Sequence, residues 1–206
     1  MTFPDEKYAS IASFFDDYAG EIGRAMASVS RSSLETAAGL LTVALSREAQ
    51  VYACGNGGSA AISNHMVCDH SKGIQTDTDL RPRVYSLSAS VELITAIAND
   101  IAYEDTFVYQ LATYARSGDV LITVSSSGDS ENVVRAVQWA KEHGVATIAF
   151  TGFEGGRTAR LADVNLHVAA LNYGVVEDVH QSLMHVLAQY IRQSRMPAAL
   201  VKERKF

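Results

Sequence analysis

The sequence predicts an α/β fold, built on a five-stranded, mainly parallel sheet flanked by helices. Three observations predict it: five short apolar runs, helical patterns between them, and polar turns at the ends of two of the runs. Parallel strands need crossover connections, which are usually helical, so this alternation favours a sheet covered on both faces.

Length and composition indicate one domain over residues 1–206. A chain of 206 residues that is 48% hydrophobic can bury a full core of its own. The net charge is −6 and no block of Lys or Arg stands out, so we expect no nucleic-acid partner. The longest apolar stretches are shorter than the ~20 residues that span a bilayer, so we expect no membrane partner. With Cys54 and Cys68 as the only cysteines, and no secretory pattern at the N-terminus, we expect a cytoplasmic protein.

Residues 1–47 are predicted to form N-terminal helices. Apolar residues recur at three- and four-residue steps from Tyr8, and a second such run begins at Leu34. The two runs predict two helices or one kinked helix over residues 8–45. These helices and the last one carry apolar faces beyond what one sheet can cover, so we expect an oligomer, a homotetramer, held by a helical bundle. The first run contains these apolar residues: Ile11, Phe14, Phe15, Tyr18 and Ile22.

Residues 48–195 are predicted to form the sheet, its covering helices and the last helix, followed by a charged tail at 196–206. Polar residues without apolar period at 74–82 predict a surface loop. The strands are expected at 50–54, 83–87, 120–124, 146–150 and 165–168. The helices are expected from 58 to about 71, and at 91–98, 105–115, 133–143, 158–161 and 176–193.

Two polar turns follow predicted strands: the glycine-rich turn 55–59 and the serine-rich turn 125–130. In open α/β sheets, ligands bind beyond the carboxyl ends of the strands, where helices begin. Unpaired N–H groups and the positive end of the helix dipole attract anions there, and serine hydroxyls add donors, so a phosphate monoester fits. Taken alone, each turn is better explained by local structure, with Ser130 a simple helix cap and the other serines filling a tight turn. Two such turns at equivalent strand ends favour ligand binding.

Imidazoles and carboxylates recur at helical spacing on two of the predicted helices. His65 and Asp69 are four residues apart, and Glu177, Gln181 and His185 follow one another at steps of four, so each set shares one helix face. Such groups could bind a divalent metal such as zinc or act as acids and bases. For each residue taken alone, a structural role is the favoured explanation. Cys68 and His70 are further candidate ligands, with Cys68 expected to be buried and His70 to face elsewhere on the helix.

The motifs together resemble the sugar isomerase (SIS) domain family, and within it the sedoheptulose-7-phosphate isomerases, also called phosphoheptose isomerases. The resemblance rests on CGNGGS at 54–59, SSSGDS at 125–130, AND at 98–100 and TG at 151–152, and it extends over about residues 5–195. It implies a phosphate site in the serine turn and sites between subunits, built around a central helical bundle. The substrate-binding residues that it implies are Asn56, Gly57, Gly58, Ser59, Asn99, Asp100, Ser125, Ser126, Ser127, Ser130 and Glu177.

The resemblance also implies a divalent metal, zinc first of all, held by His65, Asp69, Glu177 and His185. The two histidines match the family pattern. Asp69 stands where the family usually has Glu, and Glu177 where it usually has Gln. The segment before Glu177 also lacks the Asp and Arg of the family.

The implied reaction is an aldose–ketose isomerisation, from sedoheptulose 7-phosphate to D-glycero-D-manno-heptose 7-phosphate or with a related sugar phosphate. Asp69 is the expected base and His185 the expected proton carrier, with Glu177 as a rival base. Another isomerase of phosphorylated sugars is one alternative. The other is a non-catalytic SIS protein that binds a sugar phosphate or a protein such as a replication initiator.

Overall fold

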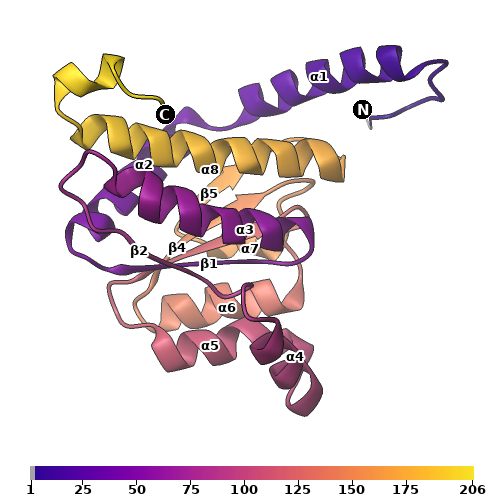
Figure 1. Cartoon of the computed structure of the whole chain (residues 1–206). Coiled ribbons are helices and arrows are strands. Elements are labelled where there is room, and N and C mark those ends of the chain that lie inside the picture. Colours follow the sequence, from indigo (N-terminus) through magenta and orange to yellow (C-terminus); the bar gives the residue numbers. More distant parts are fainter. Residues whose placement is uncertain (1–2) are drawn as a thin grey trace.

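The computed structural model describes residues 3–206 and has helices on both faces of one parallel sheet (Figure 1). The strands are β1 (Gln50–Gly55), β2 (Arg83–Ser86), β3 (Val120–Ser125), β4 (Ala146–Thr151) and β5 (Val164–His167). Their order is β2-β1-β3-β4-β5, and every neighbouring pair is parallel. The predicted α/β fold with five strands is therefore confirmed.

The central strands are apolar because both faces of the sheet are covered. All six residues of β3 are buried, as are the last five of β1 and of β4. Strands in such a position read as continuous apolar runs without alternation. This is why short apolar runs locate them in the sequence.

One face of the sheet is covered by α2 (Arg31–Ser46), α3 (Gly58–Cys68) and α8 (Tyr173–Arg195), as Figure 1 shows. A large buried cluster joins these helices to residues such as Ile122 and Phe150. The helix α3 continues as a π-helical turn, Asp69–Gly73. Within the loop predicted at 74–82, Ile74 and Leu80 are buried and anchor it to this cluster.

The other face of the sheet carries a smaller core. Here α5 (Thr106–Tyr114) and α6 (Glu131–Glu142) pack against residues such as Tyr52 and Leu121. Shorter elements are α4 (Val91–Asp100), α7 (Gly156–Leu161) and the 3-10 turns Tyr103–Asp105 and Ala198–Lys202.

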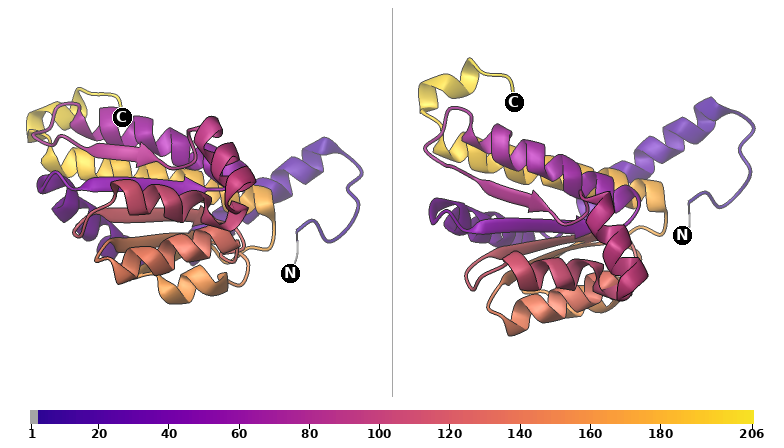
Figure 2. Two further views of the ribbon diagram at one scale, coloured as in Figure 1. Left: turned by 90° about the horizontal axis from the view of Figure 1, so that it is seen from below. Right: turned by 60° about the horizontal axis from the view of Figure 1, so that its bottom comes forward.

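The helix α1 (Ile11–Ser28) reaches away from the body of the domain in both views of Figure 2. It begins where the hydroxyl oxygen of Ser10 accepts a hydrogen bond from the backbone N–H of Ser13, at 3.1 Å, and Ser30 caps α2 in the same way. Of the two predicted alternatives, two separate helices form and not one kinked helix. Ile11 is 82% exposed and Phe15 66% exposed, so α1 presents apolar side chains that its own chain does not cover.

Candidate active site

The two polar turns lie next to each other at the switch point of the sheet. From β1 the strand order runs outward to β2 on one side and to β3 on the other, and Gly55 of β1 is in register with Val124 of β3. Ligands bind at this point in open α/β sheets, because the loops after the two strands diverge there. The position predicted for the ligand is thus the one that the topology favours.

The serine turn is held by its own backbone and by the turn after β4. The backbone N–H of Gly128 donates to both the carbonyl and the hydroxyl oxygen of Ser125, at 3.1 Å each. Gly128 has φ +62°, and a Cβ there would overlap the carbonyl of Gly155. Thr158 donates to the carbonyl of Gly128 through its N–H, at 2.9 Å. Only glycine fits at position 128, so the shape of the turn is strongly determined.

Two hydroxyls of this turn have no partner of their own. The hydroxyl of Ser126 is buried and forms no hydrogen bond within residues 3–206. Ser130 occupies the N-cap position of α6, yet its side chain makes no capping bond. Ser127 differs, because its hydroxyl accepts from the N–H of Asp129 at 3.3 Å. A buried hydroxyl without a partner is costly, and a phosphate oxygen would satisfy it.

Carboxylates also lie at the start of α6, and arginines neutralise them. Arg157 forms ion pairs with Asp129 and with Glu131, the latter at 2.8 Å. Its hydrogen bonds lower the pKa of both carboxyls, and Arg135 adds to the effect on Glu131. The carboxylates are therefore ionised and paired beside the turn.

The glycine turn is tied to the serine side through Asn56. Its amide donates to Asn132 at 2.9 Å, and its carbonyl accepts from Tyr103 at 2.9 Å and from Asn132 at 3.0 Å. No motif pointed to Tyr103 or Asn132 in the sequence. Asn56 therefore has a clear structural role, whatever it contributes to a ligand.

The other residues expected to bind substrate spread around this edge. Gly57 has φ +54° and Ser59 is buried in the first turn of α3. Asn99 and Asp100 are exposed at the end of α4, where the amide of Asn99 donates to Asp100 at 2.7 Å.

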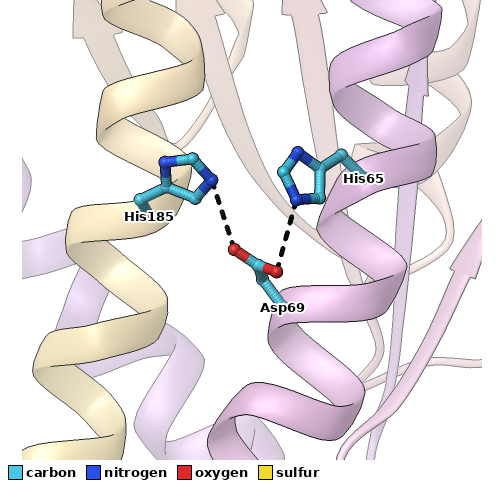
Figure 3. Close-up of side chains that lie close together, drawn as sticks. All are labelled: His65, Asp69 and His185. Carbon is cyan, nitrogen blue, oxygen red and sulfur yellow. Dashed lines mark ion pairs between the residues drawn. The ribbon is translucent and has the colours of Figure 1, made fainter. Parts of the chain in front are cut away.

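His65, Asp69 and His185 form a cluster between α3 and α8 (Figure 3). The Nε2 atom of His65 lies 3.4 Å from one oxygen of Asp69, and Nε2 of His185 lies 3.3 Å from the other. Asp69 thus points between the two imidazoles. All three residues are at least partly accessible, so small molecules can reach them.

The donor set of this cluster fits a divalent ion. Two imidazole nitrogens and one carboxylate oxygen are typical zinc ligands, at ~2.0–2.2 Å from the metal. Ligands at that distance in a tetrahedral site are separated by about 3.3 Å, which matches both nitrogen–oxygen distances. One ligand atom from each residue lies within 4.8 Å of the others. The three residues could therefore hold a metal with small adjustments.

Glu177 is a residue of α8 that lies apart from this cluster, beside the start of α3. Its carboxylate occupies the space that a Cβ on Gly58 would fill. Partial burial, and next the charge of Asp178, raise the pKa of Glu177. His65 lies seven residues after Gly58, or about 10 Å further along the helix. Within one chain, Glu177 and the glycine turn are thus separated from the histidine cluster.

Gln181 takes the place between the two imidazoles. Its amide nitrogen Nε2 lies 2.9 Å from Nδ1 of His65 and 3.0 Å from Nε2 of His185. The sequence contains a signal for this position, because Gln181 precedes His185 by four residues, but the resemblance to the family implies no role for it.

The prediction for Cys68 was wrong and that for His70 was right. Cys68 is exposed, and it lines a cavity of about 470 Å³ together with Asp69 and His185. His70 is fully buried on another side of the helix, 3.3 Å from the carbonyl of Met184. The π-helical turn that begins at Asp69 directs the two neighbours to different surroundings.

Comparison with known proteins places these features in a family. The SIS domain model matches residues 14–152. A phosphoheptose isomerase from a Nitratiruptor species is 35% identical over 164 residues, 80% of this chain and 87% of that protein. The structure is similar to that of a phosphoheptose isomerase from Neisseria gonorrhoeae, with a TM-score of 0.79 and 30% identity, over 88% of this chain and 96% of that one. It is also similar to a phosphoheptose isomerase from Francisella tularensis, with a TM-score of 0.81 and 27% identity, over 89% of this chain and 96% of that one. No helix within residues 3–206 is long and apolar enough to cross a membrane.

The domain match over residues 14–152 and the 35% identity to the Nitratiruptor protein show that the chain belongs to the SIS domain family.

Proposed function

We propose that this protein is a phosphosugar isomerase, which interconverts sedoheptulose 7-phosphate and D-glycero-D-manno-heptose 7-phosphate or a related aldose–ketose pair. The observation that carries the proposal is the cluster in which Asp69 meets two imidazoles, in a chain related to phosphoheptose isomerases over most of its length. A protein that only binds sugar phosphates has no need of such acid and base groups.

The chemistry requires a base and a proton carrier at the carbonyl end of the sugar. We assign Asp69 as the base that removes the proton from the carbon beside the carbonyl and returns it to the neighbouring carbon. His185, 3.3 Å from Asp69, would carry the proton between the substrate oxygens. A zinc ion held by His65, Asp69 and His185 would polarise the carbonyl and stabilise the negative oxygen of the enediolate.

Glu177 is the second candidate base, and one observation favours it. Its raised pKa brings it closer to the neutral range in which a general base works best. A carboxylate that binds a metal loses basicity, so Asp69 could act as ligand while Glu177 transfers the proton. In that arrangement Glu177 would not be a metal ligand, although the resemblance to the family placed it among them.

The phosphate end of the sugar would bind at the serine turn. The unpaired hydroxyl of Ser126, the free hydroxyl of Ser130 and the N–H groups at the start of α6 are donors, which a phosphate dianion needs. We also expect Ser125 and Ser127 to contribute, and Asn99 and Asp100 to contact the sugar.

We propose a homotetramer with sites between subunits. About 10 Å of α3 separate the glycine turn from His65 within one chain, so a neighbouring copy could bring a turn to the cluster. Exposed apolar residues support such contacts: Phe15 on α1, Val43 on α2, and Val186 and Tyr190 on α8. The last three line an apolar cavity of about 550 Å³. Light scattering that showed only monomer at micromolar concentration would refute this assembly.

Turnover of sedoheptulose 7-phosphate, with metal content measured on the same samples, tests the function. Asp69→Asn keeps the size of the side chain and removes its basicity, and Glu177→Gln does the same at the rival position. An inactive Asp69→Asn protein that retains metal would support Asp69 as the base. Full activity in that variant, with loss in Glu177→Gln, would assign the role to Glu177. A wild-type protein without turnover on any sugar phosphate would refute the proposed activity and favour a binding protein.

A further inference from the structure

The amide of Gln181 contacts both imidazoles of the histidine cluster at hydrogen-bond distance. The atom in contact is the amide nitrogen Nε2 of Gln181, which lies 2.9 Å from Nδ1 of His65 and 3.0 Å from Nε2 of His185. These contacts are shorter than the 3.3 and 3.4 Å that separate the imidazoles from Asp69. Gln181 is therefore the group that most closely constrains the two rings.

The two nitrogens of His65 have different partners, and this fixes their roles. Nε2 faces Asp69, and Nδ1 faces Gln181. A nitrogen that binds a metal carries no proton, so a neutral His65 that uses Nε2 as a ligand must carry its proton on Nδ1. That proton needs an acceptor within reach. Within residues 3–206, the only side chain at hydrogen-bond distance from Nδ1 is Gln181.

We propose that Gln181 is a positioning residue of the metal centre, whose carbonyl oxygen accepts the Nδ1 proton of His65 and so directs Nε2 toward the ion. The inference rests on the metal centre of the proposed function. Histidine ligands generally donate their second N–H to a carboxylate or a carbonyl, which orients the ring and makes it a better ligand. Gln181 supplies this group from α8, while His65 lies on α3.

A half-turn of the amide lets Gln181 serve the metal-free and the metal-bound protein. Without an ion, the amide NH₂ donates to Nδ1 of His65, which places the proton of the neutral ring on Nε2, 3.4 Å from Asp69. With an ion on Nε2, the proton moves to Nδ1 and the amide must present its oxygen. The same rotation withdraws the NH₂ group from Nε2 of His185, which leaves the lone pair of that nitrogen free for the ion.

The test is the affinity of the purified full-length protein for Zn²⁺, measured by competition with a chromophoric chelator. Gln181→Leu keeps approximate size and removes the acceptor, so we expect affinity to fall about 10- to 100-fold. Gln181→Glu keeps an acceptor, so we expect affinity equal to or tighter than wild type. Gln193→Leu makes the same change at an exposed position of α8 and should leave affinity unchanged.

Co²⁺ spectra and histidine ¹⁵N shifts test the positioning role itself. In the Zn²⁺-loaded wild type we expect His65 to carry its proton on Nδ1. In Gln181→Leu, the Co²⁺ bands should indicate the same number of ligands as in wild type. Loss of one ligand from these spectra would show that Gln181 binds the ion itself, which would overturn the inference.

Equal Zn²⁺ affinity in wild type and Gln181→Leu, or an equal loss in Gln181→Glu and Gln181→Leu, would also overturn the inference. A wild-type protein that binds neither Zn²⁺ nor Co²⁺ would do the same. Turnover of heptose phosphate by chelator-treated protein is measured separately. Activity in that assay would leave the proposed isomerase standing while the metal centre fails.

Discussion

Acid should loosen the packing of α8 through His180, which faces the sheet from the helix that carries His185. His180 is fully buried and its ring packs on Phe150, with centroids 5.8 Å apart. Burial lowers the pKa of His180 from 6.5 to about 4. Because the folded state binds its proton less readily than the unfolded state, stability is full above pH 6.5 and declines as the pH falls from 6.5 toward 4.

The magnitude follows from the two pKa values. At pH 5 the unfolded histidine is mostly protonated and the folded one mostly neutral, which favours unfolding about 30-fold, or ~2 kcal/mol. At pH 7.5 the effect is close to zero. Since urea changes the stability of a small protein by ~1–3 kcal/mol per molar, His180 alone should lower the urea midpoint by about 1 M between these pH values.

Urea unfolding of wild type and His180→Leu at pH 7.5 and pH 5, at one protein concentration, measures this effect. Leucine does not titrate, so the variant should lose ~2 kcal/mol less between the two pH values than wild type. Buried His70, whose pKa is also lowered to about 4, contributes equally to both proteins and cancels. His143→Leu, at an exposed position, is the matched control. The same pH dependence in wild type and His180→Leu would refute the reasoning.

Three further predictions concern the turns and the metal. Ser127→Asp places a negative charge where the phosphate would bind, so calorimetric titration with a sugar phosphate should show no binding while circular dichroism shows an intact fold. Gly128→Ala combines φ +62° with overlap against Gly155, so urea unfolding should show a loss of more than ~1–3 kcal/mol. The control is Gly23→Ala, at a position of α1 where an added Cβ meets nothing within 4 Å, which should be neutral or slightly stabilising. A similar loss of stability in Gly128→Ala and Gly23→Ala would contradict the close approach of Gly128 to Gly155. His185→Ala should lower both metal content, by elemental analysis, and turnover; unchanged metal content would exclude it as a ligand.

The sheet and its turns were predictable because the signals that set them are local. Buried parallel strands read as apolar runs, and the predicted β1 and β3 end within one residue of the observed ends. Since parallel strands bring their carboxyl ends to one edge, turns at 55–59 and 125–130 had to lie at the same edge, and that step needs only the sequence. That the two turns are neighbours follows from the pairing of β1 with β3 in the structure.

The loop at 74–82 and the environment of Cys68 depend on contacts that leave no periodic pattern. Ile74 and Leu80 are isolated apolar residues among polar ones, and yet both are buried against the helices. Cys68 is exposed although cysteine is among the most buried residue types, because it lies at the last position of α3 and lines an open cavity. Such positions are decided by tertiary packing.

The composition of the histidine cluster depends on how far α3 and α8 are displaced along each other. The spacing of four residues predicts that His65 and Asp69 share a face, and that Glu177, Gln181 and His185 do, but it leaves open which pairs face each other. Both helices begin at the same edge of the sheet and run in parallel, with Gly58 beside Glu177 and Asp69 beside His185.

In this register Glu177 lies eight residues before His185, about 12 Å along the helix axis, so within one chain its carboxylate is not part of the group formed by His65, Asp69 and His185. If α8 were displaced along α3 by one helical turn, about 5.4 Å, Glu177 or His185 would lie beside His65 in place of Gln181. Two contacts fix the position of α3 along α8. At the start of α3, glycine at position 58 leaves room for the carboxylate of Glu177, and beyond its end the buried ring of His70 lies against the carbonyl of Met184. The packing of residues outside the cluster therefore determines that an amide, and not a second carboxylate, lies between the two imidazoles.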